Sequence, residues 1–150
     1  MTGPPYVFEY AVLRVVPRVE RGESINAGVL VWCKPLGYLG ARARLDHARL
    51  RALDPGADVD AVEQALRAVC DVVPGPGPRA GSAAIDEVSR TFRWLTSPRS
   101  TVVQPGPVHT GLTTDPDAEA DRLFQLLVLP VLPVDGVAGT SSPDGSRPPG

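Results

Sequence analysis

The first half of the chain shows the two-residue periodicity of β-strands. Residues 6–16 are apolar on both alternating faces, which is typical of a strand covered on both sides, and Pro17 ends the run because it has no N–H to donate. The odd positions of residues 25–33 are all apolar, and a third alternating run follows the turn at residues 34–37. The pattern predicts a three-stranded antiparallel meander. The side chains expected to point outward from its third strand are Tyr38, Arg42 and Arg44.

The second half changes to helical periodicity. Residues 58–73 place apolar side chains three and four positions apart, a short helix is expected over residues 46–53, and a further apolar stripe follows Ser82, a typical N-cap. Residues 100–104 are predicted to form a strand that returns to the sheet.

The last helix is predicted from its start signal. Asp115 is expected to be the N-cap and Pro116 the first helical residue, because this order satisfies free N–H groups and uses the fixed φ of proline. The helix should run to about Leu129. The leucines it is expected to bury are Leu123, Leu126 and Leu127.

These elements predict one α+β domain over residues 1–132. We expect an antiparallel β-sheet, made of the meander of three strands plus the returning fourth, covered on one face by about three helices. The Pro/Gly run at residues 74–78 cannot continue as helix or strand, and residues 75–80 are expected to be a linker. Residues 133–150 are rich in Gly, Ser, Pro and Asp and are expected to form a disordered tail, since they cannot bury enough apolar area to offset their ordering entropy.

Composition narrows the functional classes. The net charge is -2, and Lys34 is the only lysine among 15 basic residues, so the arginine content alone is no sign of nucleic-acid binding. No targeting segment or membrane-length apolar run is present, and we expect a cytoplasmic protein. The chain has no nucleophile elbow, phosphate-binding loop or zinc-protease motif, and its cysteines lack paired metal-ligand spacing. We therefore expect no cofactor and no metal, and binding rather than catalysis.

One face of the predicted sheet gathers candidate binding residues. In the functional interpretation, a polar and aromatic patch grips an anion or a peptide. In the structural interpretation, Asn26 bonds to the backbone of the turn at residues 18–24, and Gly28 marks a bulge or a close approach by another strand. The candidate binding residues are Arg14, Asn26, Trp32, Tyr38, Arg42 and Arg44.

His109 and Thr110 lie in a Pro/Gly-rich stretch predicted as a loop. An imidazole there could act as a general acid or base, but the chain has only one other histidine. The alternative, which we favour, is that the stretch is shaped to position the last helix, with Gly106 and Gly111 supplying unusual φ angles.

Three short motifs carry a resemblance to a known family. They are Tyr10, Arg14 and Pro17 in the first strand, Glu23, Asn26 and Gly28 in the second, and the run from Gly106 to Gly111. Together they resemble a bacterial family of small proteins classified only as a domain of unknown function, over about Tyr10 to Leu129. Arg18 departs from the pattern, which has an acidic residue there. The resemblance implies a small accessory protein, often encoded beside a serine/threonine kinase of the persistence-toxin type.

Two hypotheses about function follow. In the first, the chain is a non-catalytic binding protein that associates with a larger enzyme, and the kinase is the first candidate partner. In the second, it is a small nucleic-acid-binding or nucleotide-processing protein that uses Arg42, Arg44, Tyr38 and Trp32 on phosphates and bases. The acidic pI of about 5.6 favours the first.

Overall fold

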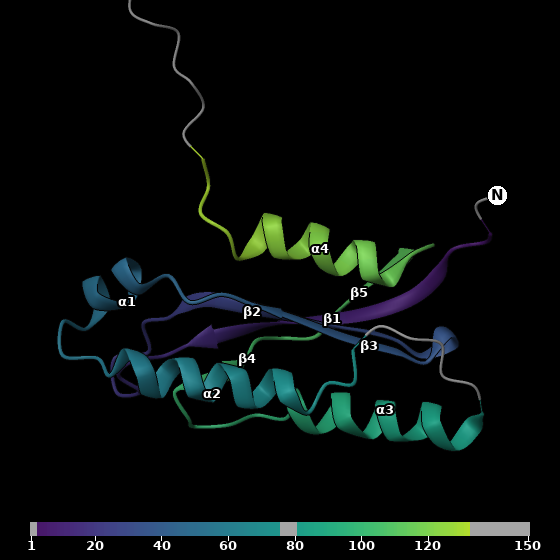
Figure 1. Cartoon of the computed structure of the whole chain (residues 1–150), viewed down its shortest axis with the longest axis horizontal. Coiled ribbons are helices and arrows are strands. Elements are labelled where there is room, and N and C mark those ends of the chain that lie inside the picture. Colours follow the sequence, from purple (N-terminus) through teal and green to yellow (C-terminus); the bar gives the residue numbers. More distant parts are fainter. Residues whose placement is uncertain (1–2, 76–80, 133–150) are drawn as a thin grey trace, which may run out of the picture.

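The chain folds into a sheet layered between helices (Figure 1). The computed structural model describes residues 3–75 and 81–132. The first three strands are β1 (Tyr6–Val15), β2 (Ile25–Cys33) and β3 (Tyr38–Ala43), with a 3-10 turn, η1 (Lys34–Leu36), before β3. The next elements are α1 (His47–Leu53), α2 (Val59–Asp71) and α3 (Ser82–Leu95). The last are β4 (Val103–Pro105), β5 (His109–Thr113) and α4 (Pro116–Leu127).

β1 is the central strand of an entirely antiparallel sheet. One of its edges pairs with β2, which pairs in turn with β3. Its other edge pairs with two short strands in succession: β5 along its first half, with Tyr10 opposite His109, and β4 along its second half, with Arg14 opposite Gln104. The α+β class with an antiparallel sheet is thus confirmed.

β5 was not predicted, since residues 105–111 were expected to be a loop. The strand lies at an edge of the sheet, and His109, Thr110 and Leu112 are exposed, so it carries no apolar alternation. Without alternation, the only local signal was the surrounding proline and glycine, which indicates a loop.

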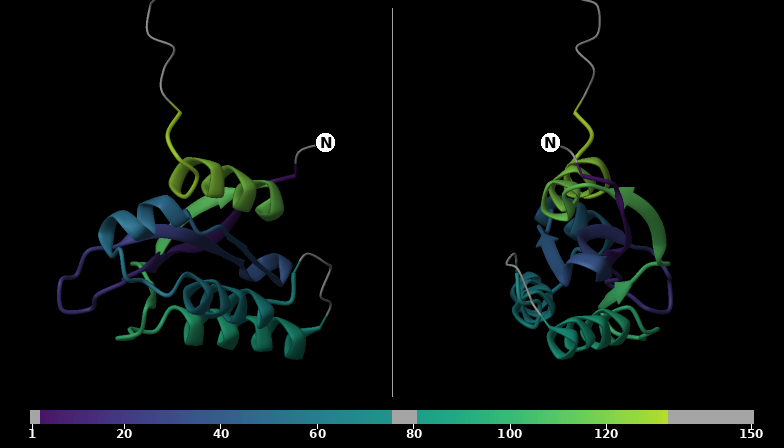
Figure 2. Two further views of the ribbon diagram at one scale, coloured as in Figure 1. Left: turned by 60° about the vertical axis from the view of Figure 1, so that its left-hand side comes forward. Right: turned by 90° about the vertical axis from the view of Figure 1, so that its right-hand side faces the viewer.

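The helices cover both faces of the sheet, and the expectation that they lie on one face was wrong in this respect. In Figures 1 and 2, α4 lies on one side of the sheet, and α2 and α3 lie on the other. The reason is that β2 is apolar on both faces. Its Val29 and Val31 pack with Leu123 of α4, whereas Leu30 and Trp32 pack with the α3 side chains.

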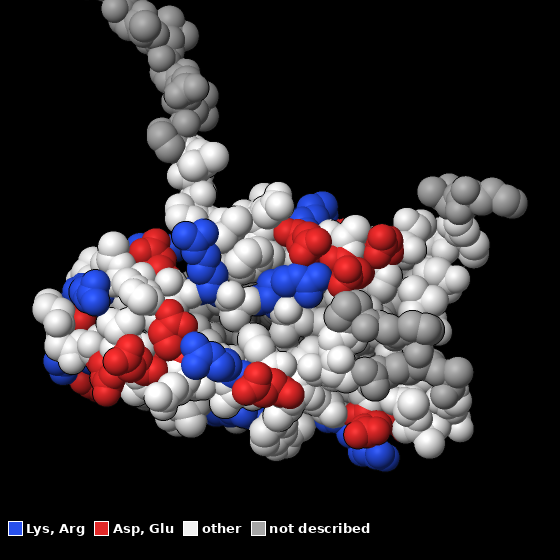
Figure 3. Space-filling view, in the orientation of Figure 1, with Lys and Arg blue, Asp and Glu red and all other residues white. Residues whose placement is uncertain are grey.

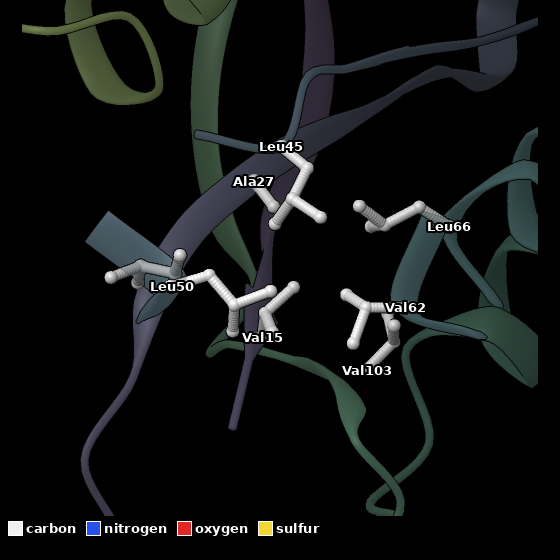
Figure 4. Packing of buried hydrophobic residues seen from close by; sticks show 8 residues of the cluster. Val15, Ala27, Leu45, Leu50, Val62, Leu66 and Val103 are labelled. Carbon is white, nitrogen blue, oxygen red and sulfur yellow. The ribbon is translucent and has the colours of Figure 1, made fainter. Parts of the chain in front are cut away.

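The end of the sheet nearest α1 is filled by a separate apolar cluster. Figure 4 shows side chains from strands and from α1 and α2 converging there. Leu50 of α1 and Val15 of β1 are fully buried within it. The cluster contains Val15, Ile25, Ala27, Leu45, Leu50, Val62, Leu66 and Val103.

Helix boundaries agree with the sequence in most respects. Asp115 accepts hydrogen bonds from the first turn of α4, and Pro116 follows it, as predicted. Two details differ: the N-cap of α3 is Gly81 rather than Ser82, and Leu126 of α4 is 62% exposed rather than buried.

Most of the predicted linker, residues 76–80, and the predicted tail, residues 133–150, lie outside the described residues. In the part of the chain that is described, no helix has the length and apolar character needed to cross a membrane.

Candidate functional site

Helix α4 is fastened to β3 by a cluster of ionic hydrogen bonds. Arg42 donates from Nη2 to Asp117 Oδ1 at 2.9 Å and from Nε to Asp121 Oδ1 at 2.8 Å. The hydroxyl of Tyr38 donates to the same Asp117 oxygen at 3.0 Å. The hydrogen bond from Arg42, and after it the bond from Tyr38, lowers the pKa of the Asp117 carboxyl. The pKa of the Tyr38 hydroxyl is raised, mainly by burial and then by its bond to Asp117. We call these four residues the α4 clamp.

Tyr38 reaches this position because the residue two places on is a glycine. A Cβ on Gly40 would lie 2.1 Å from the Tyr38 hydroxyl oxygen, so the ring lies flat along its own strand. The ring is 6% exposed. Tyr38 and Arg42 therefore do not project outward into solvent as expected, because α4 covers that face of β3.

Asn26 fastens the other end of α4. Its Nδ2 donates to the backbone oxygen of Leu127 at 3.0 Å, which satisfies a carbonyl at the helix C-terminus that has no partner within the helix. The expected bond to the turn at residues 18–24 is absent among the hydrogen bonds of the described residues. The structural interpretation of Gly28 is confirmed: β1 and β2 change register beside it, and a Cβ there would lie 2.7 Å from the carbonyl oxygen of Arg42.

The six candidate binding residues do not form one patch. Trp32 lies on the opposite face, 6% exposed, with its ring stacked on Phe92 at 4.9 Å, and its Nε1 has no hydrogen-bond partner within the described structure. Arg44 is exposed near the C-terminal end of α4. Arg14 shares the α4 side of the sheet with Asn26, its neighbour across the strands.

Arg14 is the centre of a second group on this face. Its guanidinium lies against Gly106, where a Cβ would come within 3.2 Å of Arg14 Cζ. Gly106 is held there by its N–H, which donates to the Val12 oxygen at 2.7 Å. Gln104 stands directly opposite Arg14 on β4. Among residues 3–75 and 81–132, no hydrogen bond or ion pair to the half-buried Arg14 side chain is found.

His109 continues this group along β5. Its ring lies 5.1 Å from that of Tyr10, with which it pairs across the strands, and the side chain is exposed. Thr110, one residue on, points to the other face of the sheet. We call the set Tyr10, Arg14, Gln104, Gly106 and His109 the Arg14 face.

The glycines of this segment provide space rather than unusual φ angles. Neither Gly106 nor Gly111 is among the positive-φ glycines of the described residues, so that expectation was wrong. Gly106 makes room for the Arg14 guanidinium, and Gly111 for the ring of Phe8, which a Cβ would approach to 2.7 Å. Both side chains come from β1, so the segment is fitted to that strand.

The Arg14 face is suited to binding an anion. Within the described residues it offers a guanidinium without a carboxylate partner, a carboxamide on the residue opposite it, and an exposed imidazole whose ring is tilted against that of Tyr10. No carboxylate hydrogen-bonds His109 within the described residues, so it lacks the group that orients a catalytic base. No cluster of three His, Cys, Asp or Glu side chains that could hold a metal ion occurs in residues 3–75 and 81–132.

Sequence reasoning named Arg14 and His109 as candidate residues but missed Tyr10 and Gln104, because their positions beside Arg14 and His109 depend on strand register.

Charges of both signs are mixed over the surface that includes α4 and α2. Figure 3 shows positive and negative side chains side by side on that view, without a broad area of one sign. Ion pairs of the described residues include Arg42 with Asp117 and Asp121, and Arg18 with Asp54. A surface of this kind lacks the continuous positive stripe typical of nucleic-acid binding.

Four of the residues that carried the family resemblance share one side of the sheet. Tyr10 and Arg14 of β1, Asn26 of β2 and His109 of β5 lie on the same side of the sheet. No curated protein and no solved structure matches the chain. A family model described as "Protein of unknown function (DUF3037)" matches residues 10–128, and since these make up most of the chain, the protein belongs to that family.

Proposed function

We propose that this protein is a non-catalytic binding module that associates with a larger enzyme through the Arg14 face. The observation that carries the proposal is the half-buried guanidinium of Arg14, which lies against Gly106 and has no acidic partner among the described residues. Arginine held in a fixed position without a counter-ion favours a ligand that brings its own negative charge.

The ligand group we propose is a carboxylate in an acidic segment of the partner protein. The planar guanidinium can donate two parallel hydrogen bonds to a carboxylate, and the Gln104 carboxamide across the strand can supply a further donor. The rings of Tyr10 and His109 extend the surface and provide apolar contact for the partner's neighbouring side chains.

The first partner to test is a serine/threonine kinase of the persistence-toxin type, acting with this chain in the cytoplasm. The support for this choice is the family resemblance, which implies that such kinases are often encoded nearby. The absence of an orienting group beside His109, within the described residues, supports an accessory role over a catalytic one.

The nucleic-acid hypothesis loses three of its four proposed contact residues, and only Arg44 stays exposed. Trp32 and Tyr38 are each 6% exposed and cannot stack on bases, and Arg42 is engaged with two aspartates. We therefore rank binding to a protein above binding to nucleic acid.

The experiment is isothermal titration calorimetry of the full chain with a purified serine/threonine kinase of the persistence-toxin type. Arg14→Ala should weaken binding by about thirtyfold or more, since a desolvated charge pair loses one partner. Arg44→Ala is the matched control, because Arg44 is also on the α4 side but outside the Arg14 face, and it should bind within about twofold of the wild type. Equal losses in both variants would contradict a role for the Arg14 face. In a parallel anisotropy assay, saturable binding of single-stranded RNA that Arg14→Ala abolishes would favour the nucleic-acid hypothesis instead.

A further inference from the structure

An apolar groove runs along the outer side of α2, on the face of the sheet away from the Arg14 face. Its second wall is the segment that leads from α3 to β4. The half beside the C-terminal part of α2 is a hollow of about 290 Å³, and the half beside the N-terminal part is a hollow of about 260 Å³. The two hollows share Ala65 and Val102. We call the whole feature the α2 groove.

The first hollow carries a projecting aromatic side chain. Trp94 is 59% exposed, and the Arg99 guanidinium lies over its ring, 4.4 Å from the centroid. Val72 and Val102 beside it are also exposed. An exposed tryptophan with an arginine and aliphatic neighbours has the composition of an interface hot spot.

The second hollow is lined by small apolar groups and lacks a projecting side chain of this kind. Pro17, Ala57 and Ala61 form its walls. It has room for an aromatic side chain from another molecule. The groove therefore presents a projection in one half and a matching apolar recess in the other.

The two halves also differ in charge. Arg99 stands at the Trp94 end. Asp58 stands at the other end, where its carboxylate accepts a hydrogen bond only from the backbone N–H of Ala61 among the described residues. Asp54, on the same side, is already paired with Arg18 at 3.4 Å. Asp58, which has no ion-pair partner among the described residues, thus places a negative charge at the opposite end of the groove from Arg99.

We propose that the α2 groove binds a second copy of this chain in a twofold-symmetric dimer. A twofold axis near the shared Ala65 places each Trp94 in the recess beside Ala61 of the other copy and brings each Arg99 toward the other copy's Asp58. A second copy fits better than an unrelated helix because the projection, the recess and both charges lie on this one surface. A single twofold rotation forms the contact of Trp94 with the recess and the contact of Arg99 with Asp58 twice, once in each direction.

Sedimentation velocity of the full chain, from micromolar to near-millimolar concentration, tests the proposal. The expected result is a reversible monomer–dimer equilibrium in the wild type. Trp94→Ala should weaken the dimer by about thirtyfold or more. Because Trp94 is largely exposed, this variant should keep the wild-type melting temperature at a concentration where both proteins are monomeric, which shows that the fold is intact.

Two further variants separate the groove from general surface effects. Ala65→Arg places a charged side chain at the shared wall and should abolish the dimer, whereas Gln64→Arg, one residue away and outside both hollows, should leave it unchanged. Asp58→Asn keeps a helix N-cap but removes the charge, and should weaken the dimer most at low salt. A protein that stays monomeric at every concentration overturns the proposal. So does a dimer that is insensitive to both Trp94→Ala and Ala65→Arg, or an assembly that grows beyond two copies.

Discussion

Asn26 and Leu127 stand 101 positions apart in the sequence, and a hydrogen bond of 3.0 Å joins the Asn26 amide to the Leu127 carbonyl. It secures the C-terminal end of α4, while Arg42 and Tyr38 secure the N-terminal half through Asp117. Helix α4 is therefore attached to the sheet by polar contacts at both ends and by Ala120 and Leu123 between them.

Asn26→Ala should lower the free energy of unfolding by about 1 kcal/mol, the value of a lost hydrogen bond whose acceptor can reach water. Urea denaturation of the full chain measures this change. Gln104→Ala, which removes another carboxamide on the same face without a hydrogen bond in the described structure, should cost less. An Asn26→Ala variant as stable as the wild type contradicts the role of this bond.

Arg42→Ala should destabilise the fold by about 1–2 kcal/mol, because two aspartates of α4 lose their common partner. The exposed Arg44→Ala should change stability by less than about 0.5 kcal/mol. Thermal melts followed by circular dichroism measure both. If Arg42 and Arg44 both pointed outward, as expected from the sequence, charge reversal at either would leave the fold intact. The α4 clamp predicts instead that reversal at Arg42 disrupts the fold.

Acid should loosen α4 through Asp117. Its folded-state pKa is lowered, so its contribution to stability is fully present above the ordinary value of 3.8 and is lost as the pH falls through the folded-state value. The urea midpoint of the wild type should drop over this range. Asp117→Asn should lack this part of the drop, and identical pH profiles for the two proteins would count against the clamp.

His109→Ala should cost only about 0.5 kcal/mol, since the ring contacts Tyr10 at an exposed position and forms no hydrogen bond in the described structure. His109→Phe should keep the ring contact and the stability. Thermal melts of the two variants test this, and a large loss with Phe would show that a ring nitrogen is needed.

The sequence predicted elements whose signals are local. Alternation identified β1, β2 and β3, and Asp115 with Pro116 marked the start of α4, because strand periodicity and helix capping depend on near neighbours. It missed β5, whose exposed residues carry no periodicity.

The candidate site was predicted less well because it depends on pairing across the sheet. The positions of Arg42 and Trp32 are set by which helix covers each face, and the pairing of Asn26 with Leu127 joins distant segments. The grouping of Arg14 with Gln104 and Gly106 required the register of β1 with β4, which no local pattern specifies.

The proposed function requires that the Arg14 guanidinium bind a carboxylate, and NMR of the Arg14 side chain tests this most directly. A glutamate-rich peptide is titrated into the full-length ¹⁵N-labelled chain while the arginine Nε–Hε and backbone amide signals are followed. We predict saturable, salt-sensitive shifts of Arg14 Hε and of the Gly106 and His109 amides, and little change at Arg44. Signals of the Arg14 face that stay fixed, or that shift no more than those of Arg44, would contradict the claim.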